Sequence, residues 1–311
     1  MMSGILGHDA ALTVLKSLTA HTLLFVGPPR VGRRQVARWY AQRLNCQVSG
    51  QTLGHDPCGH CESCRFFASG EHPDYREVAP VGETKSGRRS RRPLLRIGDL
   101  VRREDGSENP LGPWLEARPR FRYRVGVIDG ADTLSEGAAN AFLKFLEEPP
   151  SYAVIILIAP SVGSVLPTLV SRSVPVRFGA VEAEIETPEP HPAARLGRVG
   201  ELLEAAAQPD AFSARLEIVN HYLLALEKGL EEALEGADAL EKAWGEDTPF
   251  SIPELLRARM GEWPPQSYAD ALTALERCEE ALAAYAAPGI AVQVLTLELR
   301  ALRKRVVSRP L

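Results

Sequence analysis

Near the N-terminus, an apolar stretch, a loop with two glycines and a helical pattern follow one another, and this order limits the folds open to the chain. Residues 21–26 (HTLLFV) have the composition of a buried strand, and residues 33–44 have helical spacing. Between them, Gly27 and Gly32 frame a turn whose backbone N–H groups can face an anion at the helix N-terminus, where the helix dipole favours negative charge. This is the layout of a phosphate-binding loop.

Strand and helix patterns alternate over the first half of the chain, which indicates an α/β fold around a mostly parallel sheet. The other predicted strands are residues 74–79, 124–129, 154–159 and 174–178. Residues 135–148 form a predicted helix, which ends at Pro149 and Pro150. We therefore expect residues 1–180 to form one α/β domain.

The composition changes at residue 181. Residues 181–194 are acidic and rich in proline, which is typical of a linker between domains. Helical patterns then cover residues 195–207, 212–244, 252–260, 268–286 and 290–307. The sequence thus predicts a linker region at 181–208 and an all-helical domain at 209–311.

Overall charge and hydropathy exclude some classes of protein. The 311 residues carry a net charge of -4, so any contact with nucleic acid has to come from local patches. The first eight residues lack the pattern of a signal peptide, and the longest apolar run, residues 153–160, is too short to span a membrane. These features predict a cytoplasmic protein without a membrane partner.

The phosphate-binding loop departs from the pattern of a hydrolysing one. A working loop ends in lysine and then serine or threonine, where the lysine reaches the terminal phosphates and the hydroxyl holds Mg²⁺. Here these positions hold Arg33 and Arg34. Arginine keeps a positive charge, but its planar head does not replace the compact charge of lysine, and Arg34 cannot ligate magnesium. The turn is then either a weakened nucleotide site or only a scaffold.

Two later strands lack further parts of the same machinery. The strand at 124–129 ends in Asp129, at the place of the magnesium-binding aspartate, but Gly130 replaces the glutamate that usually orients the attacking water. The strand at 154–159 runs into Ala159 and Pro160 where a polar residue is expected. Together these absences predict that Gly27, Gly32, Arg33 and Asp129 form a degenerate site that does not hydrolyse ATP.

Four of the five cysteines lie within nineteen residues. Thiolates from Cys46, Cys58, Cys61 and Cys64 can complete a tetrahedral zinc site with no open position, which would be structural. An iron–sulfur cluster also uses four thiolates, but no redox function fits the rest of the chain. The nearby His55 and His60 are expected to be solvated. Cys278, alone in a helical stretch, is expected to be a packed core residue.

A basic segment at residues 85–103 has two interpretations. Its lysine and arginines can contact DNA phosphates, which would add a salt-sensitive affinity independent of sequence. A basic run of this kind is more often a mobile, solvated loop, and we favour that interpretation of the run by itself. The segment has little aromatic content for base stacking, and residues 94–103 have helical spacing.

Several motifs together resemble the clamp-loader subunits of bacterial DNA polymerase III, which are AAA+ proteins. Residues 139–150 (ANAFLKFLEEPP) look like the helix that follows their magnesium strand, and residues 168–173 (TLVSRS) resemble their Ser-Arg-Cys motif, with Ser173 replacing the cysteine. The cysteine cluster followed by His72-Pro-Asp-Tyr75 matches their zinc module. Residues 275–302 look like the collar that holds these subunits in a ring.

The resemblance implies a domain plan. Residues 1–180 would be an AAA+-type P-loop domain with a parallel sheet and a zinc module inserted at 46–64. Residues 181–208 would be a linker with a reduced or partial helical lid, and residues 209–311 the helical collar.

The resemblance also implies a role. Arg172 would act in trans on the γ-phosphate of ATP bound to the neighbouring subunit. The missing lysine, hydroxyl and glutamate favour the delta-prime type, a non-catalytic subunit, over the hydrolysing gamma/tau type. Its partners would be the gamma/tau and delta subunits and, through the complex, the sliding clamp and primed DNA. The alternatives are an active gamma/tau-like ATPase in which Arg33 replaces lysine, and a zinc-containing DNA-binding protein outside the replication machinery.

Overall fold

The computed structural model describes residues 5–48, 55–83, 89–95, 97–102, 110–181, 199–244, 251–284 and 286–307. The chain divides into two compact units, Met1–Val181 and Glu182–Leu311, which we call the N-terminal and the C-terminal unit. Each unit is described by itself.

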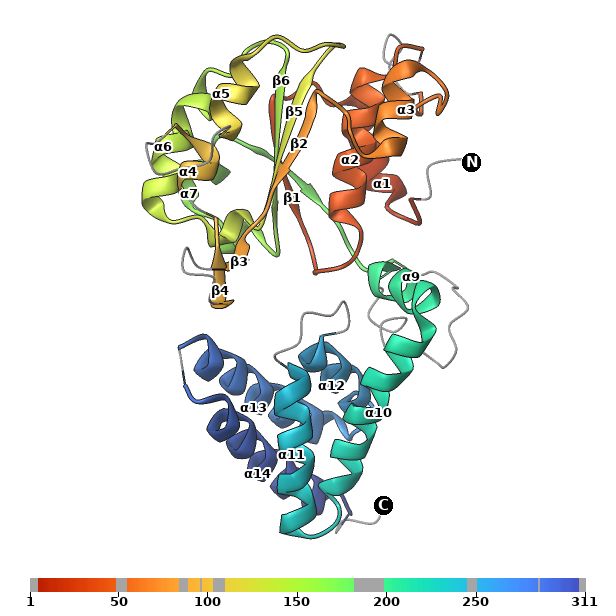
Figure 1. The fold of residues 1–311 in the computed structure, drawn as a ribbon, viewed down its shortest axis with the longest axis vertical. Coiled ribbons are helices and arrows are strands. Elements are labelled where there is room, and N and C mark those ends of the chain that lie inside the picture. Colours follow the sequence, from red (N-terminus) through yellow and green to blue (C-terminus); the bar gives the residue numbers. More distant parts are fainter. Residues whose placement is uncertain are drawn as a thin grey trace. The chain divides into compact units, whose positions relative to one another are not determined.

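A five-stranded sheet with the order β2-β5-β6-β1-β7 forms the centre of the N-terminal unit (Figure 1). The strands are β1 (Thr22–Val26), β2 (Tyr75–Val78), β5 (Arg124–Asp129), β6 (Ala153–Ala159) and β7 (Val174–Arg177). All of the paired strands are parallel. Every residue of β1 and β6 is buried, which explains why both strands are apolar runs without alternation. The predicted α/β fold with a parallel sheet is confirmed.

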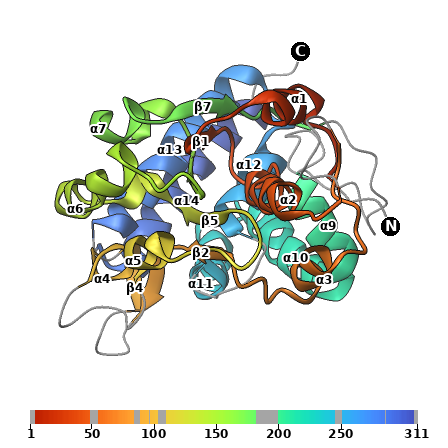
Figure 2. The same ribbon diagram turned by 90° about the horizontal axis from the view of Figure 1, so that it is seen from above.

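Helices cover both faces of this sheet. In Figures 1 and 2, α1, α2 and α3 lie on one side, and α4, α5, α6 and α7 lie on the other. These helices are α1 (Asp9–Ser17), α2 (Arg33–Asn45), α3 (Glu62–Ser69), α4 (Ile97–Leu100), α5 (Leu111–Glu116), α6 (Glu136–Glu147) and α7 (Pro167–Val170). Successive residues of β1 point to opposite cores, since Leu23 packs with Tyr40 of α2, whereas Leu24 packs with Phe142 of α6.

The basic segment at 85–103 contains elements that the sequence did not predict. Strands β3 (Val81–Glu83) and β4 (Arg89–Leu94) pair antiparallel, and among the described residues of 94–103, where helical spacing was expected, the helix is Ile97–Leu100. Leu94 itself belongs to β4 and not to a helix. Lys85 and Arg88 lie outside the described residues, as do the side chains of 89–94. The DNA-contact hypothesis for this segment therefore stays a prediction.

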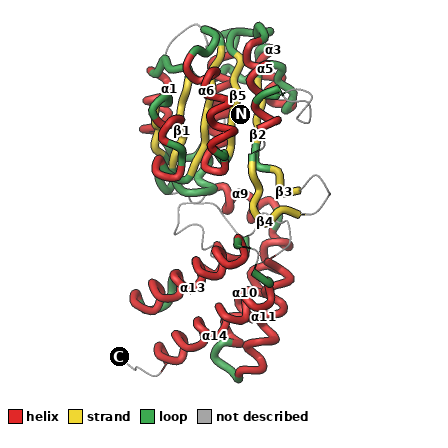
Figure 3. The backbone as a smooth tube through the Cα atoms, turned by 90° about the vertical axis from the view of Figure 1, so that its left-hand side faces the viewer, coloured by secondary structure: helices red, strands yellow, loops and turns green. Residues whose placement is uncertain are grey.

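The C-terminal unit is helical throughout its described residues, as predicted (Figure 3). Its helices are α9 (Val199–Ala207), α10 (Pro209–Ala225), α11 (Leu230–Trp244), α12 (Ile252–Met260), α13 (Pro265–Ala283) and α14 (Pro288–Val307). They share one apolar core. Within it, the hydroxyl of Tyr222 donates to Thr296 Oγ1 at 3.0 Å, and Thr296 donates in turn to the carbonyl of Val292. This chain of bonds satisfies two buried hydroxyls between α10 and α14.

One predicted helical stretch, residues 212–244, is interrupted. The N–H groups of Glu227 and Lys228 donate to carbonyls three residues earlier, which ends α10 before Gly229. The turn allows α11 to pack back on α10, where a β-carbon on Gly236 would lie 3.3 Å from that of Ala225. Both helices bury apolar faces, so the periodic pattern alone did not show the turn. Among the described residues, no helix is long and apolar enough to cross a membrane.

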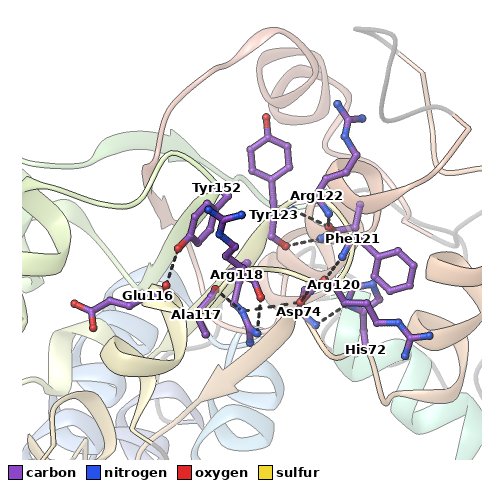
Figure 4. A network of polar contacts seen from close by, with 12 residues as sticks. His72, Asp74, Glu116, Ala117, Arg118, Arg120, Phe121, Arg122, Tyr123 and Tyr152 are labelled. Carbon is purple, nitrogen blue, oxygen red and sulfur yellow. Dashed lines mark hydrogen bonds and ion pairs between the residues drawn. The ribbon is translucent and has the colours of Figure 1, made fainter.

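Two buried polar side chains fix the loop that leads into β5 (Figure 4). The fully buried carboxylate of Asp74 accepts from the N–H groups of Arg120 and Phe121, at 2.9 and 2.7 Å. Asn45, at the end of α2, accepts from the N–H groups of Arg122 and Tyr123 in the same way. These bonds satisfy four backbone donors just before β5 and so help to fix where that strand begins.

His72 is a buried histidine within this network. The N–H of Asp74 donates to Nδ1 of His72, so its Nε2 carries the proton and donates to Ser63 Oγ at 3.0 Å. Its ring also stacks on that of Phe67, with centroids 4.1 Å apart. Burial lowers the pKa of His72 from 6.5 to about 4, and Arg120 lowers it further, against the raising effect of Asp74. The residue is therefore a neutral structural histidine in the native chain.

This pKa makes the stability of the chain depend on pH. The unfolded chain takes up a proton on His72 near pH 6.5, whereas the folded chain does so only near pH 4. Stability is therefore full above pH 6.5 and falls as the pH drops towards 4, by up to about 1.4 kcal/mol per pH unit for this group. In urea denaturation between pH 6.5 and 5, the free energy of unfolding of His72→Gln should fall less steeply with decreasing pH than that of the wild type. An unchanged slope would contradict the assignment, and His221→Gln, at an exposed position, is the control.

Candidate functional site: a closed phosphate loop, a cysteine cluster and an exposed arginine

The phosphate-binding loop connects β1 to α2, as the sequence predicted. Gly27 donates its N–H to the carbonyl of Pro160 at 3.2 Å, and a β-carbon at this position would lie 2.2 Å from the carbonyl oxygen of Phe178. Gly32 begins α2 with a φ of 100°, in the left-handed region. Both glycines are thus required by the backbone itself, the first by a close approach and the second by its conformation.

Arg33, at the lysine position, is bound within its own chain. Its Nη1 donates to the carbonyl of Ala159 at the end of β6. Burial lowers the pKa of this guanidinium, while Asp129 and Asp132 raise it. Burial likewise raises the pKa of the Asp129 carboxyl, against Arg34 and Arg33, which lower it. The group that would meet a phosphate therefore binds the end of β6 instead.

Arg34, at the position of the magnesium-binding hydroxyl, pairs with Glu77 of β2. Its Nε and Nη2 both contact Oε2 of that carboxylate, and the hydroxyl of Tyr75 donates to Oε1. The hydrogen bond to Glu77 is the main reason why the pKa of Arg34 is raised. Burial and Glu77 raise the pKa of the Tyr75 phenol, so it stays protonated and keeps donating. Sequence reasoning missed Glu77, although it lies in the predicted strand beside the one that ends in Asp129.

Gly130, where a hydrolysing enzyme has its glutamate, is also fixed by its backbone. Its φ is 90°, its N–H donates to the carbonyl of Ile158 at 3.1 Å, and a β-carbon would lie 2.8 Å from Cγ of Pro80. A side chain here would be strained as well as crowded. The backbone path after β5 therefore excludes the side chain of a general base at this position.

The four clustered cysteines come together, as predicted. Their Sγ atoms all lie within 4.8 Å of one another, with 4.0 Å between Cys46 and Cys61 and 3.9 Å between Cys58 and Cys64. A tetrahedron with Zn–S bonds of about 2.3 Å has S–S edges of about 3.8 Å. The donor set and its spacing fit a zinc ion with no open position, which would bind structurally.

Local structure supports this arrangement of thiols. Cys46 follows the last residue of α2, and Cys61 precedes the first residue of α3. The N–H groups of Cys58 and Cys61 donate to the sulfur atoms of Cys46 and Cys58, both at 3.4 Å, as is expected around thiolate ligands. Burial raises the pKa of the Cys64 thiol, so a bound cation would have to displace its proton. Cys278 is buried in the core of the C-terminal unit.

Arg172 lies on the surface between α7 and β7. Its Nε and Nη2 contact Oε1 of Glu147 at 2.9 and 2.6 Å, and its Nη1 donates to the carbonyl of Thr168 and to Ser171 Oγ. A third of the Arg172 side chain remains exposed, at 34%. In the described part of the chain, the contacts of Arg172 are with Glu147, Thr168 and Ser171, and not with the phosphate-binding loop. Glu147 belongs to a recognised motif, but only the fold shows that it pairs with Arg172.

Comparison with known proteins decides the family. A family model described as "DNA polymerase III, delta subunit" matches residues 12–182. The delta-prime subunits of DNA polymerase III from Pseudomonas aeruginosa and Haemophilus influenzae are 32% and 30% identical, over 50% and 53% of this chain. This chain belongs to the DNA polymerase III delta-prime subunit family. The predicted resemblance is confirmed.

The matches have defined limits. They cover 42% and 44% of the two delta-prime relatives, so the chain spans less than half the length of the relatives it matches. The tau subunit of DNA polymerase III from Escherichia coli is 30% identical over 58% of this chain and 26% of that protein. A crystal structure of a gamma subunit-related protein from Thermotoga maritima superposes with a TM-score of 0.52, covering 94% of this chain and 99% of that one. At 16% identity this likeness shows a shared fold.

Zinc binding by this family member can be measured directly. We expect about one zinc ion per purified chain by mass spectrometry of the metal content, and a strong loss in Cys61→Ser. The loss of a structural ion should lower the melting temperature, because the metal binds the folded chain and not the unfolded one. Cys278→Ser should keep its zinc. A folded wild type that carries no zinc and gains no stability from added zinc would contradict the assignment.

Restoring the missing glutamate, lysine and hydroxyl should not produce ATP hydrolysis. In a triple variant with Gly130→Glu, Arg33→Lys and Arg34→Thr, we expect no ATP hydrolysis, because the backbone at Gly130 directs the new side chain against Pro80. Gly130→Glu alone should lower the free energy of unfolding by about 1–3 kcal/mol. Gly179→Ala, where an added β-carbon meets nothing within 4 Å, should leave it almost unchanged. Turnover by the triple variant would show that sequence, and not backbone geometry, limits hydrolysis.

Proposed function

We propose that this chain is a non-hydrolysing, delta-prime-type subunit of the DNA polymerase III clamp loader. It would act in the cytoplasm with gamma/tau and delta subunits that load the sliding clamp on primed DNA. The observation that carries the proposal is that Arg33 and Arg34, which replace the catalytic lysine and hydroxyl, are both bound to groups of the same chain. Arg33 donates to the carbonyl of Ala159 and Arg34 pairs with the carboxylate of Glu77, so both guanidinium groups already have partners inside the protein.

Arg172 is the residue that we propose to act in catalysis. A guanidinium from one subunit neutralises the charge that spreads over the oxygens of the transferred phosphoryl group in another, and such fingers contribute about 10³–10⁵ in rate. Three observations support this role. Arg172 is partly exposed, it lies in the segment that resembles Ser-Arg-Cys, and within the described residues its polar contacts are with Glu147, Thr168 and Ser171 and not with the phosphate-binding loop.

We propose further that residues 209–311 form the collar and that residues 181–208 hold the linker and a reduced lid. Helix α14 supports the collar role, because it exposes Ile290, Val294 and Leu297 to 64%, 50% and 50%. These residues are spaced by four and three positions, so they share one face of the helix. An apolar stripe of this kind is typical of a contact with another subunit. The zinc site would stabilise the N-terminal unit and take no part in catalysis.

The similarity to tau subunits favours a second function, an active clamp-loader ATPase. The two functions differ in a direct measurement. The isolated chain should neither bind ATP tightly in the presence of Mg²⁺ nor hydrolyse it, whereas an active ATPase would do both. Turnover by the isolated chain would restore the second function.

The proposed role of Arg172 is tested in the complex reconstituted with gamma/tau and delta subunits of the same organism. Arg172→Ala should lower hydrolysis at the ATP site that it completes by about 10³ or more, so the total rate should fall by the share of that site. Arg177→Ala, an exposed arginine of β7, should leave the rate unchanged. A complex that assembles with Arg172→Ala and hydrolyses ATP at the normal rate would refute the trans-acting role.

A further inference from the structure

The ion pair between Arg172 and Glu147 joins two elements that pack against each other. Glu147 is the last residue of α6, and Arg172 follows α7. Phe142 of α6 and Leu169 of α7 lie fully buried in the same apolar core. In Figures 1 and 2 both helices lie on the same side of the sheet. The two charged residues are therefore held at a fixed spacing by buried side chains beneath them.

Helix electrostatics do not favour an acid at this position. The C-terminal end of a helix carries partial negative charge, so a carboxylate in its last turn is unfavourable and a lysine or arginine is preferred. Helix α6 has Lys144 in its last turn but ends in Glu147 and Glu148. The stability of α6 therefore does not account for a carboxylate at 147. Its contact with Arg172 does, since it is the side-chain bond that Glu147 makes in the described part of the chain.

The contact uses one particular edge of the guanidinium. Oε1 of Glu147 accepts from both Nε and Nη2, which form the side edge of the planar group. Nη1 donates to Thr168 and Ser171. A guanidinium has five N–H donors, so these bonds leave one N–H of Nη2 without a partner in the described residues, and the Ser171 bond is long at 3.2 Å. The end of the group remains able to meet a further anion.

We propose that Glu147 is a positioning residue, which holds the guanidinium of Arg172 by its side edge so that its end faces the phosphate bound to the neighbouring subunit. This inference rests on the proposed trans-acting role of Arg172. An exposed arginine otherwise samples many rotamers, and fixing one of them in advance lowers the entropy that is lost when the catalytic arrangement forms. To position Arg172, Glu147 has to supply one oxygen atom that accepts two hydrogen bonds. The negative charge of the carboxylate is not required.

The same geometry permits the opposite role, in which Glu147 withholds Arg172 from the phosphate. The two roles make different predictions for two variants. Glu147→Ala removes the acceptor and the charge, whereas Glu147→Gln removes the charge and keeps an oxygen that can accept from Nε and Nη2. A positioning oxygen is lost only in the first variant, and a withholding charge is lost in both.

The test measures ATP hydrolysis by the reconstituted complex that contains the full-length chain. For Glu147→Ala we expect kcat at the site completed by Arg172 to fall about three- to fivefold, since the net contribution of hydrogen bonds of this kind is modest. KM for ATP and the assembly of the complex should stay unchanged. Glu147→Gln should recover most of the rate. Glu148→Ala, at the exposed neighbouring position, is the matched control and should behave as the wild type.

A double variant separates this inference from the function on which it rests. If Glu147 acts through Arg172, then Arg172→Ala combined with Glu147→Ala should be no slower than Arg172→Ala alone. A normal rate in Arg172→Ala would refute the trans-acting role itself. If Arg172→Ala is slow, a raised rate in both Glu147 variants would show that the carboxylate withholds the arginine. A normal rate in both would show that Glu147 has no part in the reaction, and either outcome would overturn the proposal.

Discussion

The burial of the parallel sheet on both faces is the constraint on which the rest of the N-terminal unit depends. Strands β1 and β6 are buried along their whole length, so neither face of the sheet is open to a ligand. In sheets of this kind the carboxyl ends of the strands are the open edge. Gly27, Asp129 and Ala159 all lie at that edge, because each directly follows or ends a parallel strand. Any chemistry of the loop has to take place there.

Two arginines at this edge bind groups of their own chain. Arg33 binds the carbonyl of Ala159 beside Asp129, and Arg34 binds Glu77. In a hydrolysing protein the same places would serve phosphate and magnesium. The three residues therefore have related effects. Arg33 and Arg34 stand where a hydrolysing protein has the lysine and hydroxyl that bind the nucleotide and its magnesium ion, and the backbone at Gly130 leaves no room for the side chain of a base. The family membership, which the delta-prime relatives show, agrees with this arrangement.

Local patterns predicted much of the fold. The five strands were placed within one residue at each end. Strands β1 and β6 were the clearest, because a strand that is buried on both faces has to be apolar throughout. The cysteine cluster was equally clear, since four thiols within nineteen residues have few other uses in a chain of this kind. The pattern failed where two elements share one periodicity. Residues 212–244 are periodic across the turn at Gly229, and residues 94–103 are periodic although Leu94 belongs to β4.

The sequence by itself determined the α/β class, the position of the loop, the identity of its altered residues and the clustering of the thiols. Each of these depends on neighbours along the chain or on a single strand. Only the tertiary structure decided which charges meet. Arg34 and Glu77 are 43 positions apart, Asp74 and Arg120 are 46 apart, and Arg172 and Glu147 are 25 apart. Such pairs follow from the order of the strands and the packing of helices on them, which residue periodicity does not encode.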